Sequence, residues 1–483
     1  MRARALVALA LSLCLLVAAC SGGAERKRPA APATEPGGAA SAKRPNIVLV
    51  LTDDQDIRSQ RAIPATMRLI GHRGTIFERS FANFPVCCPS RATLITGQLA
   101  HNHGVTDNHP PRGGWQALTR RRDTLGVWLQ RAGYRTAWIG KFLNGWGIEG
   151  RYRIPPGWSD WQVPVEESYL RMYGYTLDVN GRLVRYGSSP ADYQTAVLAR
   201  RAESYVRRAA RRPAPFFMVF APSAPHQEAD YLGLRGPDPR PAPRDRGAFA
   251  GAPLPRPPSF NERDVSDKPP AARAPRLGAA ARAALRRNYV GRMESLLSVD
   301  RAVRGLVAGL RRAGELRRTV IIYTSDNGYL LGEHRMTGKK PVLYEELVRV
   351  PLMVRGPGFT PGERVAAPVS NADLAPTILG LAGASAGRPL DGVSLARVAA
   401  DPQAWRRRAI LLEEAGALRG LRAGPYAYTS YGRGQRELYD LRSDPYELRN
   451  RAGSPGLAPV ERRLAALLAR LRRCRGRACV ARW

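Results

Sequence analysis

Residues 85–97, Pro-Val-Cys-Cys-Pro-Ser-Arg-Ala-Thr-Leu-Ile-Thr-Gly, hold the side chains best suited to chemistry. Pro89 suits the first position of a helix, because its missing N–H is not needed there, and Gly97 suits the helix end. Cys87 would then lie just before a helix N-terminus, where free N–H groups and the helix dipole favour an anion. Arg91 would follow one turn later. This geometry predicts a site that handles a sulfate or phosphate group.

The spacing Cys-x-Pro-Ser-Arg-x-x-Leu-x-Thr-Gly in this stretch resembles the signature of the sulfatase family. The resemblance implies that a formylglycine-generating enzyme oxidises Cys87 to formylglycine before export, and that the hydrated aldehyde is the nucleophile. Cys88 then fills the variable position. A buried cysteine pair or a disulfide is the alternative, but adjacent cysteines rarely bridge each other. The fixed positions of the signature are met by Cys87, Pro89, Ser90, Arg91, Leu94, Thr96 and Gly97.

Acidic side chains follow two runs of aliphatic residues that predict central parallel strands, residues 46–52 and 319–324. Two adjacent carboxylates, Asp53 and Asp54, repel each other unless a cation neutralises them, although a solvated acidic turn is the alternative. Oxygen ligands without thiolate or imidazole favour a hard cation, and a mixed carboxylate–amide set suits Ca²⁺. The sulfatase resemblance implies one calcium ion, held by Asp53, Asp54, Asp326, Asn327 and the modified Cys87.

Three further side chains complete the predicted site. Lys141 follows a predicted strand at residues 136–140, and in sulfatases the corresponding lysine contacts the sulfate, as does the one corresponding to Lys340. His226 follows the apolar strand at 215–221. A histidine titrates near neutrality and can protonate a leaving alkoxide, and the resemblance gives His226 that role. Without the resemblance, each would be a solvated surface group or a turn residue.

One departure from the common sulfatase pattern narrows the subfamily. Many sulfatases carry a histidine two residues after the lysine, whereas this chain has Phe142-Leu143-Asn144. The same Lys-aromatic-Leu-Asn pattern occurs in N-acetylglucosamine-6-sulfatases and extracellular heparan endosulfatases, as does a segment resembling residues 260–270. The Pro-rich insertion at 234–275 is expected to be functional or disordered, and it could shape the substrate mouth. His101 and His103 lack a third zinc ligand, so we expect loop residues near the site, with a catalytic role left open.

The order of elements predicts an α/β fold, which the resemblance specifies as alkaline phosphatase-like: a mixed, mostly parallel sheet flanked by helices. An apolar stripe predicts one long helix over residues 279–313 as core packing. Beyond about residue 395 the pattern changes to short strands and a final helix at 460–472. We therefore expect a catalytic domain at 45–395 and a small C-terminal α+β subdomain at 396–483.

The N-terminus predicts export. Arg2 and Arg4 precede an apolar run too short to span a membrane, and its end, Val-Ala-Ala-Cys20, resembles a bacterial lipobox. We expect a lipoprotein signal peptide at 1–19, a lipid on Cys20 and a Pro/Ala/Gly-rich tether at 20–44, with plain secretion as the alternative. The protein would then lie on the outer face of the cell membrane. In such a chain Cys474 and Cys479, five residues apart, predict a local disulfide.

The net charge of +36 is extreme, but of 76 basic residues only six are lysine, which leaves 70 arginines. A GC-rich coding bias explains most of this imbalance, although a positive field would also attract polyanions. No zinc-finger spacing or aromatic–basic RNA-binding signature is present, so we expect sulfated glycans rather than nucleic acid. An aryl sulfatase, a phosphonate or phosphate monoesterase of the same superfamily, and a non-catalytic polyanion-binding lipoprotein remain as alternatives to a sugar sulfatase.

Overall fold

The structure, a computed structural model, describes residues 44–147, 153–165, 168–229, 238–338 and 341–483. The predicted signal peptide, the predicted lipid site Cys20, the predicted tether up to residue 43 and Lys340 therefore lie outside the described residues. Residues 43–483 form one compact unit. The boundary that we expect near residue 395 stays a prediction.

A ten-stranded sheet runs through the molecule in the order β13-β2-β12-β9-β1-β8-β4-β5-β6-β7. Its centre, from β9 to β5, is parallel, while β12 pairs antiparallel with β9, and β5, β6 and β7 form an antiparallel extension. The strands are β1 (Asn46–Thr52), β2 (Thr75–Phe77), β4 (Arg135–Gly140), β5 (Asp160–Pro164), β6 (Thr176–Val179), β7 (Arg182–Arg185), β8 (Phe216–Ala221), β9 (Thr319–Ser325), β12 (Leu352–Arg355) and β13 (Arg364–Val365).

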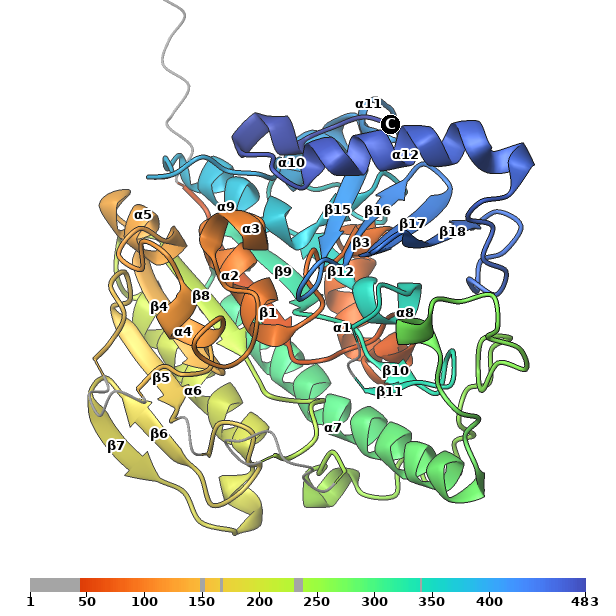
Figure 1. Cartoon of the computed structure of the whole chain (residues 1–483). Helices are drawn as coiled ribbons and strands as arrows, with labels where there is room; N and C mark the ends of the chain where they lie inside the picture. Colours follow the sequence, from red (N-terminus) through yellow and green to blue (C-terminus); the bar gives the residue numbers. More distant parts are fainter. Residues whose placement is uncertain (1–43, 148–152, 166–167, 230–237, 339–340) are drawn as a thin grey trace, which may run out of the picture. The chain divides into compact units, whose positions relative to one another are not determined.

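The central strand β1 is buried along its whole length because helices cover both faces of the sheet (Figure 1). Its alternate side chains enter different cores: Leu49 packs in the cluster that contains residues of α2, α5 and α9, and Val50 packs with residues of α6 and α7. This continuous apolar run is typical of parallel strands covered on both sides. The five helices are α2 (Cys87–Thr96), α5 (Leu125–Arg131), α6 (Gln194–Ala210), α7 (Ala279–Arg312) and α9 (Leu374–Ala382).

The C-terminal part forms a separate antiparallel sheet, β15 (Ala409–Glu413), β16 (Arg419–Ala423), β17 (Tyr426–Gly432) and β18 (Gln435–Asp440), in that order. Helix α12 (Ala458–Leu471) packs on it, with Leu464 and Leu468 in a core shared with Leu421. The predicted disulfide between Cys474 and Cys479 is confirmed. The layered mixed sheet and this small C-terminal sheet confirm the predicted fold class.

Short elements connect these parts. Their bounds are α1 (Pro64–Thr66), α3 (Ala100–His103), α4 (Gly114–Ala117), α8 (Glu345–Val348), α10 (Leu395–Ala400) and α11 (Pro402–Trp405), with two small ribbons, β3 (Ser80–Phe81) with β14 (Val369–Ser370) and β10 (Leu330–Leu331) with β11 (Thr337–Gly338). No helix in the described part of the chain has both the length and the apolar sequence that crossing a bilayer requires.

Candidate active site

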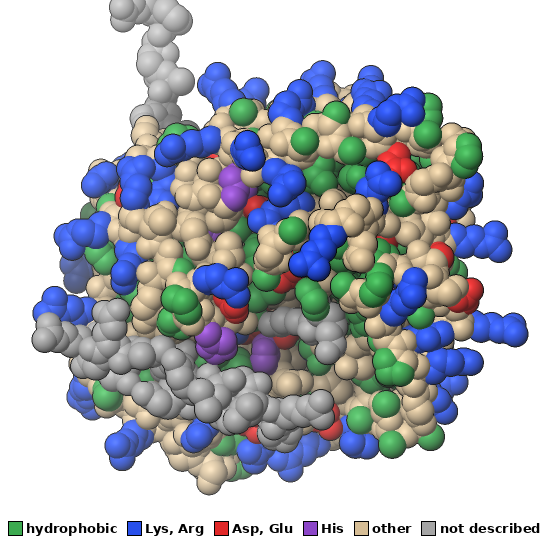
Figure 2. Space-filling view, in the orientation of Figure 1, with side chains coloured by type: hydrophobic (Ala, Val, Ile, Leu, Met, Phe, Trp, Pro, Cys, Tyr) green, Lys and Arg blue, Asp and Glu red, His purple; other side chains and the backbone are tan. Residues whose placement is uncertain are grey.

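The carboxyl ends of four neighbouring parallel strands bring the predicted side chains to one edge of the sheet. Asp53 and Asp54 follow β1, Lys141 follows β4, and Asp326 follows β9, while His226 lies in the loop after β8. Ligands of open α/β sheets bind at this edge. Figure 2 shows histidine and acidic side chains in a hollow near the middle of one face, with Lys and Arg side chains spread around it.

The hollow contains a cavity of about 330 Å³. Predicted site residues line it together with residues from other loops. The lining consists of Asp54, Cys87, Asn108, His109, Lys141, Asn144, Tyr169, Leu170, His226, Gln227, Ala229, Tyr329 and Gly338.

Helix α2 presents Cys87 to this cavity. The helix begins at Cys87, two residues before the start predicted from Pro89, because the Val86 carbonyl already accepts the Ser90 N–H at 3.0 Å. Pro89 is then the third helical residue, where its missing N–H still leaves no helical bond unmade. Gly97 ends the helix with a positive φ of 64°, as predicted. The Cys87 sulfur is buried at the first turn, 3.3 Å from Asp53 Oδ1.

Arg91 ties the strand ends together below the cavity. Its Nε donates to Asp326 Oδ2 (2.8 Å), and one Nη donates to the Lys141 carbonyl (2.6 Å). The other Nη lies 3.6 Å from Asp53 Oδ2. Burial alone would lower the pKa of Arg91, but the charges of Asp326 and Asp53 raise it. The side chain is fully buried and is not among the residues that line the cavity, so it contacts the other site residues rather than the open space.

Lys141 and Asp53 form a buried ion pair in which Lys141 Nζ donates to Asp53 Oδ2. Burial favours the neutral form of each group, yet the lysine lowers the pKa of Asp53, with His226 and Arg91 acting in the same direction. The Asp53 charge in turn raises the pKa of Lys141 against the effect of burial. Both groups are therefore ionised at neutral pH.

The two carboxylates and the amide oxygen at this site suit a metal ion that prefers oxygen ligands. Ligand atoms of Asp53, Asp54, Cys87 and His226 lie within 4.8 Å of one another. Asn327 donates through Nδ2 to Asp54 Oδ1 (2.7 Å), and its Oδ1 is buried without a hydrogen-bond partner among the described residues. An amide oxygen in this condition, beside two carboxylates, has the chemistry of a Ca²⁺ ligand.

Asp326 is placed differently from the other predicted ligands. It is not part of the group of mutually close ligand atoms. Its Oδ1 accepts the Asp54 backbone N–H (3.0 Å), and its Oδ2 accepts from Arg91. The carboxylate lies next to the candidate metal site and also orients the loop that carries Asp54.

His226 points one ring nitrogen at the site. Its Nδ1 lies 2.6 Å from the Gln227 carbonyl, and because a carbonyl only accepts, Nδ1 carries the proton. Its Nε2 lies 3.4 Å from Asp54 Oδ2. The imidazole therefore carries a proton on Nδ1 and directs Nε2 toward the metal ligands.

Several lining residues were not predicted. Asn108 and His109 enter from the loop after α3, where Asn108 Oδ1 accepts the Cys88 N–H at 2.9 Å. Tyr169 places its ring 5.3 Å from Lys141 Nζ. No motif in the sequence announces these residues, because each reaches the cavity through a long loop. Gly338, two residues before Lys340, also lines the cavity.

His101 and His103 are not at the site, contrary to the expectation. They lie on helix α3 rather than in a loop. His101 contacts Glu413 and the Cys474 carbonyl, and His103 contacts Thr93 Oγ1 (3.1 Å), with burial lowering its pKa to about 3. Both histidines therefore make structural contacts between α3 and neighbouring elements and do not line the cavity. In the described part of the insertion, residues 238–275, no side chain lines the cavity.

Comparisons with known proteins agree with this geometry. A family model described as Sulfatase matches residues 45–384, and one described as N-sulphoglucosamine sulphohydrolase, C-terminal, matches residues 332–474. The arylsulfatase of Volvox carteri is 34% identical over 92% of this chain and 77% of its own length. The human N-acetylglucosamine-6-sulfatase is 36% identical over 74% of this chain. The matched region covers 65% of the length of the human protein.

Solved structures support the same conclusion. A protein in complex with its substrate D-glucosamine-2-N,6-O-disulfate superposes with a TM-score of 0.75 at 25% identity, over 88% of this chain and 97% of that chain. A phosphonate monoester hydrolase of Agrobacterium radiobacter shares the fold, with a TM-score of 0.63 at 24% identity over 89% and 95% of the two chains. The chain belongs to the sulfatase family and is a sulfuric ester hydrolase.

Proposed function

We propose that this protein is a calcium-dependent sulfatase that uses formylglycine at position 87 to hydrolyse a sulfate ester of a sugar or glycosaminoglycan. One observation carries the proposal. Cys87 and Asp54 line one cavity, and each contacts a buried group that can bind a cation: Cys87 Sγ lies 3.3 Å from Asp53 Oδ1, and Asp54 accepts from Asn327, whose Oδ1 has no hydrogen-bond partner among the described residues. Asp53, Asp54, Asn327 and the modified Cys87 would hold the ion, and Asp326 would complete its surroundings.

We assign a different role to each charged group at the site. When bound, the metal ion supplies a Lewis acid that polarises the nucleophile and a sulfate oxygen. Lys141 lies at the cavity wall and offsets charge that develops on the sulfuryl oxygens, and Lys340 is proposed to do the same. Arg91 positions Asp326 and the Lys141 backbone from below. The sulfatase resemblance also implies that Arg91 offsets charge on the sulfuryl oxygens, and we propose a positioning role instead because Arg91 does not line the cavity.

His226 is the proposed acid for the leaving group. With Nδ1 held by the Gln227 carbonyl, the proton that reaches the sugar oxygen must be carried on Nε2, the nitrogen on the ligand side. A sugar alkoxide is a poor leaving group, so its departure depends on this proton. This chain has no histidine two residues after Lys141, but Asn144 and His109 line the cavity and are proposed to contact the sugar or the sulfate.

The sugar is proposed to be N-acetylglucosamine 6-sulfate or a related unit. Relatives named N-acetylglucosamine-6-sulfatase and the neighbour crystallised with a disulfated glucosamine support this choice. The competing substrates are an aryl sulfate, suggested by the arylsulfatase relatives, and a phosphate or phosphonate monoester, suggested by the phosphonate monoester hydrolase that shares the fold. Turnover of N-acetylglucosamine 6-sulfate well above that of an aryl phosphate or phosphonate is the expected result, and the reverse order would assign the chain to the monoesterases.

Mass spectrometry of the peptide that contains residue 87, from enzyme produced in its natural host, tests the nucleophile. We expect the mass of formylglycine at position 87 and an unmodified cysteine at position 88. Cys88→Ser is a matched control, because Cys88 Sγ accepts the Asn144 N–H at 3.1 Å and a hydroxyl can also accept it. Cys87→Ser should abolish turnover while Cys88→Ser retains it. An active enzyme with unmodified Cys87 would refute the mechanism.

The exported, lipid-anchored state is a separate proposal that rests on the N-terminal sequence. Cys20→Ala should release the enzyme from the membrane fraction without changing its kinetics in solution. Retention of that variant on the membrane would exclude lipid on Cys20 as the anchor. Binding of heparin by wild-type enzyme that releases no sulfate would instead support the non-catalytic polyanion-binding alternative.

A further inference from the structure

A groove outside the active site runs along helix α6 on the flank of the sheet. Two adjoining hollows of about 510 and 350 Å³ make up this groove, and Arg208 lines both. The first lies at the amino ends of β4 and β5, on the opposite edge of the sheet from Cys87. We call the two hollows together the α6 groove and define it by the basic residues that line them: Arg135, Arg200, Arg201, Arg208, Arg211 and Arg212.

The charge of this lining is almost entirely positive. Asp160 is the one acidic residue among the described lining of the two hollows, and Arg208 already neutralises it at 2.7 Å. Arg211 and Arg212 are exposed and form no side-chain hydrogen bond or ion pair with the described residues. In the chain as a whole, 40 acidic residues accompany 76 basic ones, so the groove is more one-sided than the composition requires.

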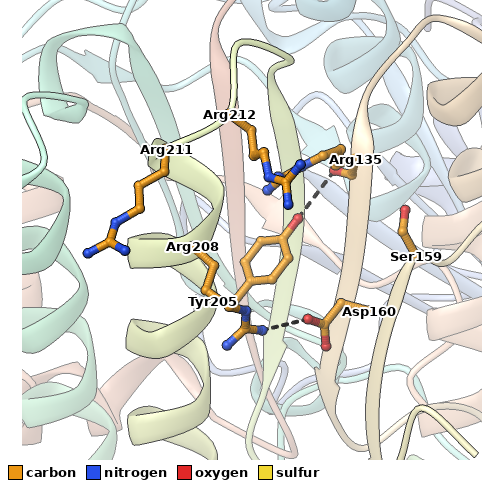
Figure 3. A pocket seen from close by; sticks show the side chains of 7 residues that line it. All are labelled: Arg135, Ser159, Asp160, Tyr205, Arg208, Arg211 and Arg212. Carbon is orange, nitrogen blue, oxygen red and sulfur yellow. Dashed lines mark hydrogen bonds and ion pairs between the residues drawn. The ribbon is translucent and has the colours of Figure 1, made fainter.

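The first hollow brings like charges together. Figure 3 shows Arg135 and Arg212 directed toward the same end of the hollow, above the Tyr205 hydroxyl, while Arg211 points away. Arg135 Nε is buried without a hydrogen-bond partner in the part of the chain that the structure describes. Two guanidinium groups that meet without a carboxylate are stabilised by an anion, and their planar donors match sulfate or phosphate oxygens.

The second hollow adds groups that suit a sugar. Its wall contains Tyr186, stacked on Tyr175 at 5.0 Å, and the amides of Gln162 and Asn180. From Arg200 to the helix end at Ala210, α6 rises about 15 Å, at about 1.5 Å per residue. A site of this length with polar, aromatic and basic groups suits an extended sulfated chain better than a single small anion.

Helix α6 begins beside the active site and extends from there to the groove. At the start of α6, Gln194 Nε2 donates to the Tyr169 carbonyl (3.3 Å), and Tyr169 lines the catalytic cavity. That cavity, at about 330 Å³, leaves most of a polysaccharide outside it. We infer that the α6 groove binds a sulfated polysaccharide whose end lies in the catalytic cavity, so the substrate is polymeric. This inference rests on the proposed sulfatase function.

A charge-reversal pair tests the inference. Arg211→Glu/Arg212→Glu alters two exposed residues just past the end of α6. The matched control is Arg311→Glu/Arg312→Glu, which alters the last two residues of α7, also exposed and unpaired among the described residues, with the same change of net charge. The assay compares the KM for a heparin-type sulfated polysaccharide with that for a monosaccharide 6-sulfate.

We expect the α6 pair to raise the KM for the polysaccharide about fivefold or more and to leave the monosaccharide kinetics unchanged, with less than about a twofold effect from the control. Equal effects of both pairs would overturn the inference in favour of a diffuse positive field, and no effect of the α6 pair would show that the groove does not bind the polysaccharide. Loss of binding to anionic phospholipid vesicles with unchanged polysaccharide kinetics would assign the groove to a membrane instead.

A failure of the proposed function gives a different result. In that case the wild-type enzyme releases sulfate from neither substrate, and direct titration with heparin oligosaccharides tests the groove by itself. Weaker oligosaccharide binding by the α6 pair than by the α7 pair would then show that the groove binds sulfated polysaccharide although the protein does not hydrolyse it. Equal binding by the two pairs would exclude the site.

Discussion

Two buried clusters of charged side chains respond to the loss of water in opposite ways. In the active site, Lys141, with His226 and Arg91, lowers the pKa of Asp53 although burial acts to raise it. In a second cluster, formed by Glu333, Glu346 and Glu447, burial is the dominant effect. It raises the pKa of Glu333 to about 7 and that of Glu447 to about 8. We call this second group the acid cluster.

The difference follows from the ratio of cations to carboxylates. Asp53 pairs with Lys141, for which the described residues show no second carboxylate partner, and it also lies 3.6 Å from Arg91, which pairs with Asp326 as well. In the acid cluster each guanidinium is shared: Arg58 pairs with both Glu333 and Glu346, and Arg422 pairs with both Glu345 and Glu447. A buried carboxylate that shares its cation retains its proton to higher pH. The active site therefore keeps its charge for chemistry, while the acid cluster is an element of the framework.

The largest expected effect is the loss of turnover on changing Asp326 to Asn. The amide can still accept from Arg91 but no longer supplies the negative charge beside the metal ligands. We expect turnover to fall about 10³-fold or more, with loss of bound calcium measured by elemental analysis. Asp300→Asn is the control: this buried carboxylate accepts the Thr66 hydroxyl at 2.7 Å far from the cavity, and its loss should change stability alone. Full activity of Asp326→Asn would refute the metal assignment.

Lys141→Met should have the next largest effect. Methionine keeps the length of the side chain but removes the cation that lines the cavity and holds Asp53 ionised. We expect kcat to fall about 10²- to 10³-fold, as for the removal of one donor to a developing anion. The pH profile of the residual activity should also shift, because the pKa of Asp53 rises without Lys141. A change in KM alone would show that Lys141 only binds substrate.

Much of this arrangement was predictable from the sequence because it depends on local patterns. The central strand was predicted at residues 46–52 and is β1, and the long helix predicted at 279–313 is α7. Strand ends in a parallel sheet share an edge, so the side chains after β1, β4 and β9 could be placed together without coordinates. The signature around Cys87 also predicted a helix, and its residues from Cys87 to Thr96 form α2.

The remaining features depend on tertiary contacts that no short pattern encodes. His109 and Tyr169 reach the cavity through loops. His101 lies outside the cavity because its ring hydrogen-bonds to the carboxylate of Glu413, more than 300 residues later. The antiparallel extension β5–β7 was missed because its strands are short and their side chains partly exposed. The acid cluster joins Glu333 to Glu447 across the fold, so its raised pKa values are invisible in the sequence.

A third variant, His226→Gln, separates proton transfer from electrostatics within the active site. Glutamine keeps a polar group near Asp54 but cannot protonate a leaving oxygen. We expect about a 10²-fold loss of kcat with a sugar sulfate, and less than a tenfold loss with an aryl sulfate, because a nitrophenolate leaves without a proton. Equal losses with both substrates would show that His226 acts on the sulfate or the metal ligands instead.

The variant Glu447→Gln tests the acid cluster, and we expect its effect, which is on stability, to be the smallest. The folded state keeps the Glu447 proton up to about pH 8, whereas the unfolded chain releases it near the ordinary pKa. The folded state therefore binds more protons in this window, and its stability falls as the pH rises from about 4.5 to 8. Glutamine removes this contribution, so the variant should gain about 1–3 kcal/mol relative to wild type between pH 5 and pH 8 in urea unfolding. Glu363→Gln, outside both clusters, should run parallel to wild type. If Glu447→Gln also runs parallel, the carboxyl is ionised throughout, and the contrast between the two clusters disappears.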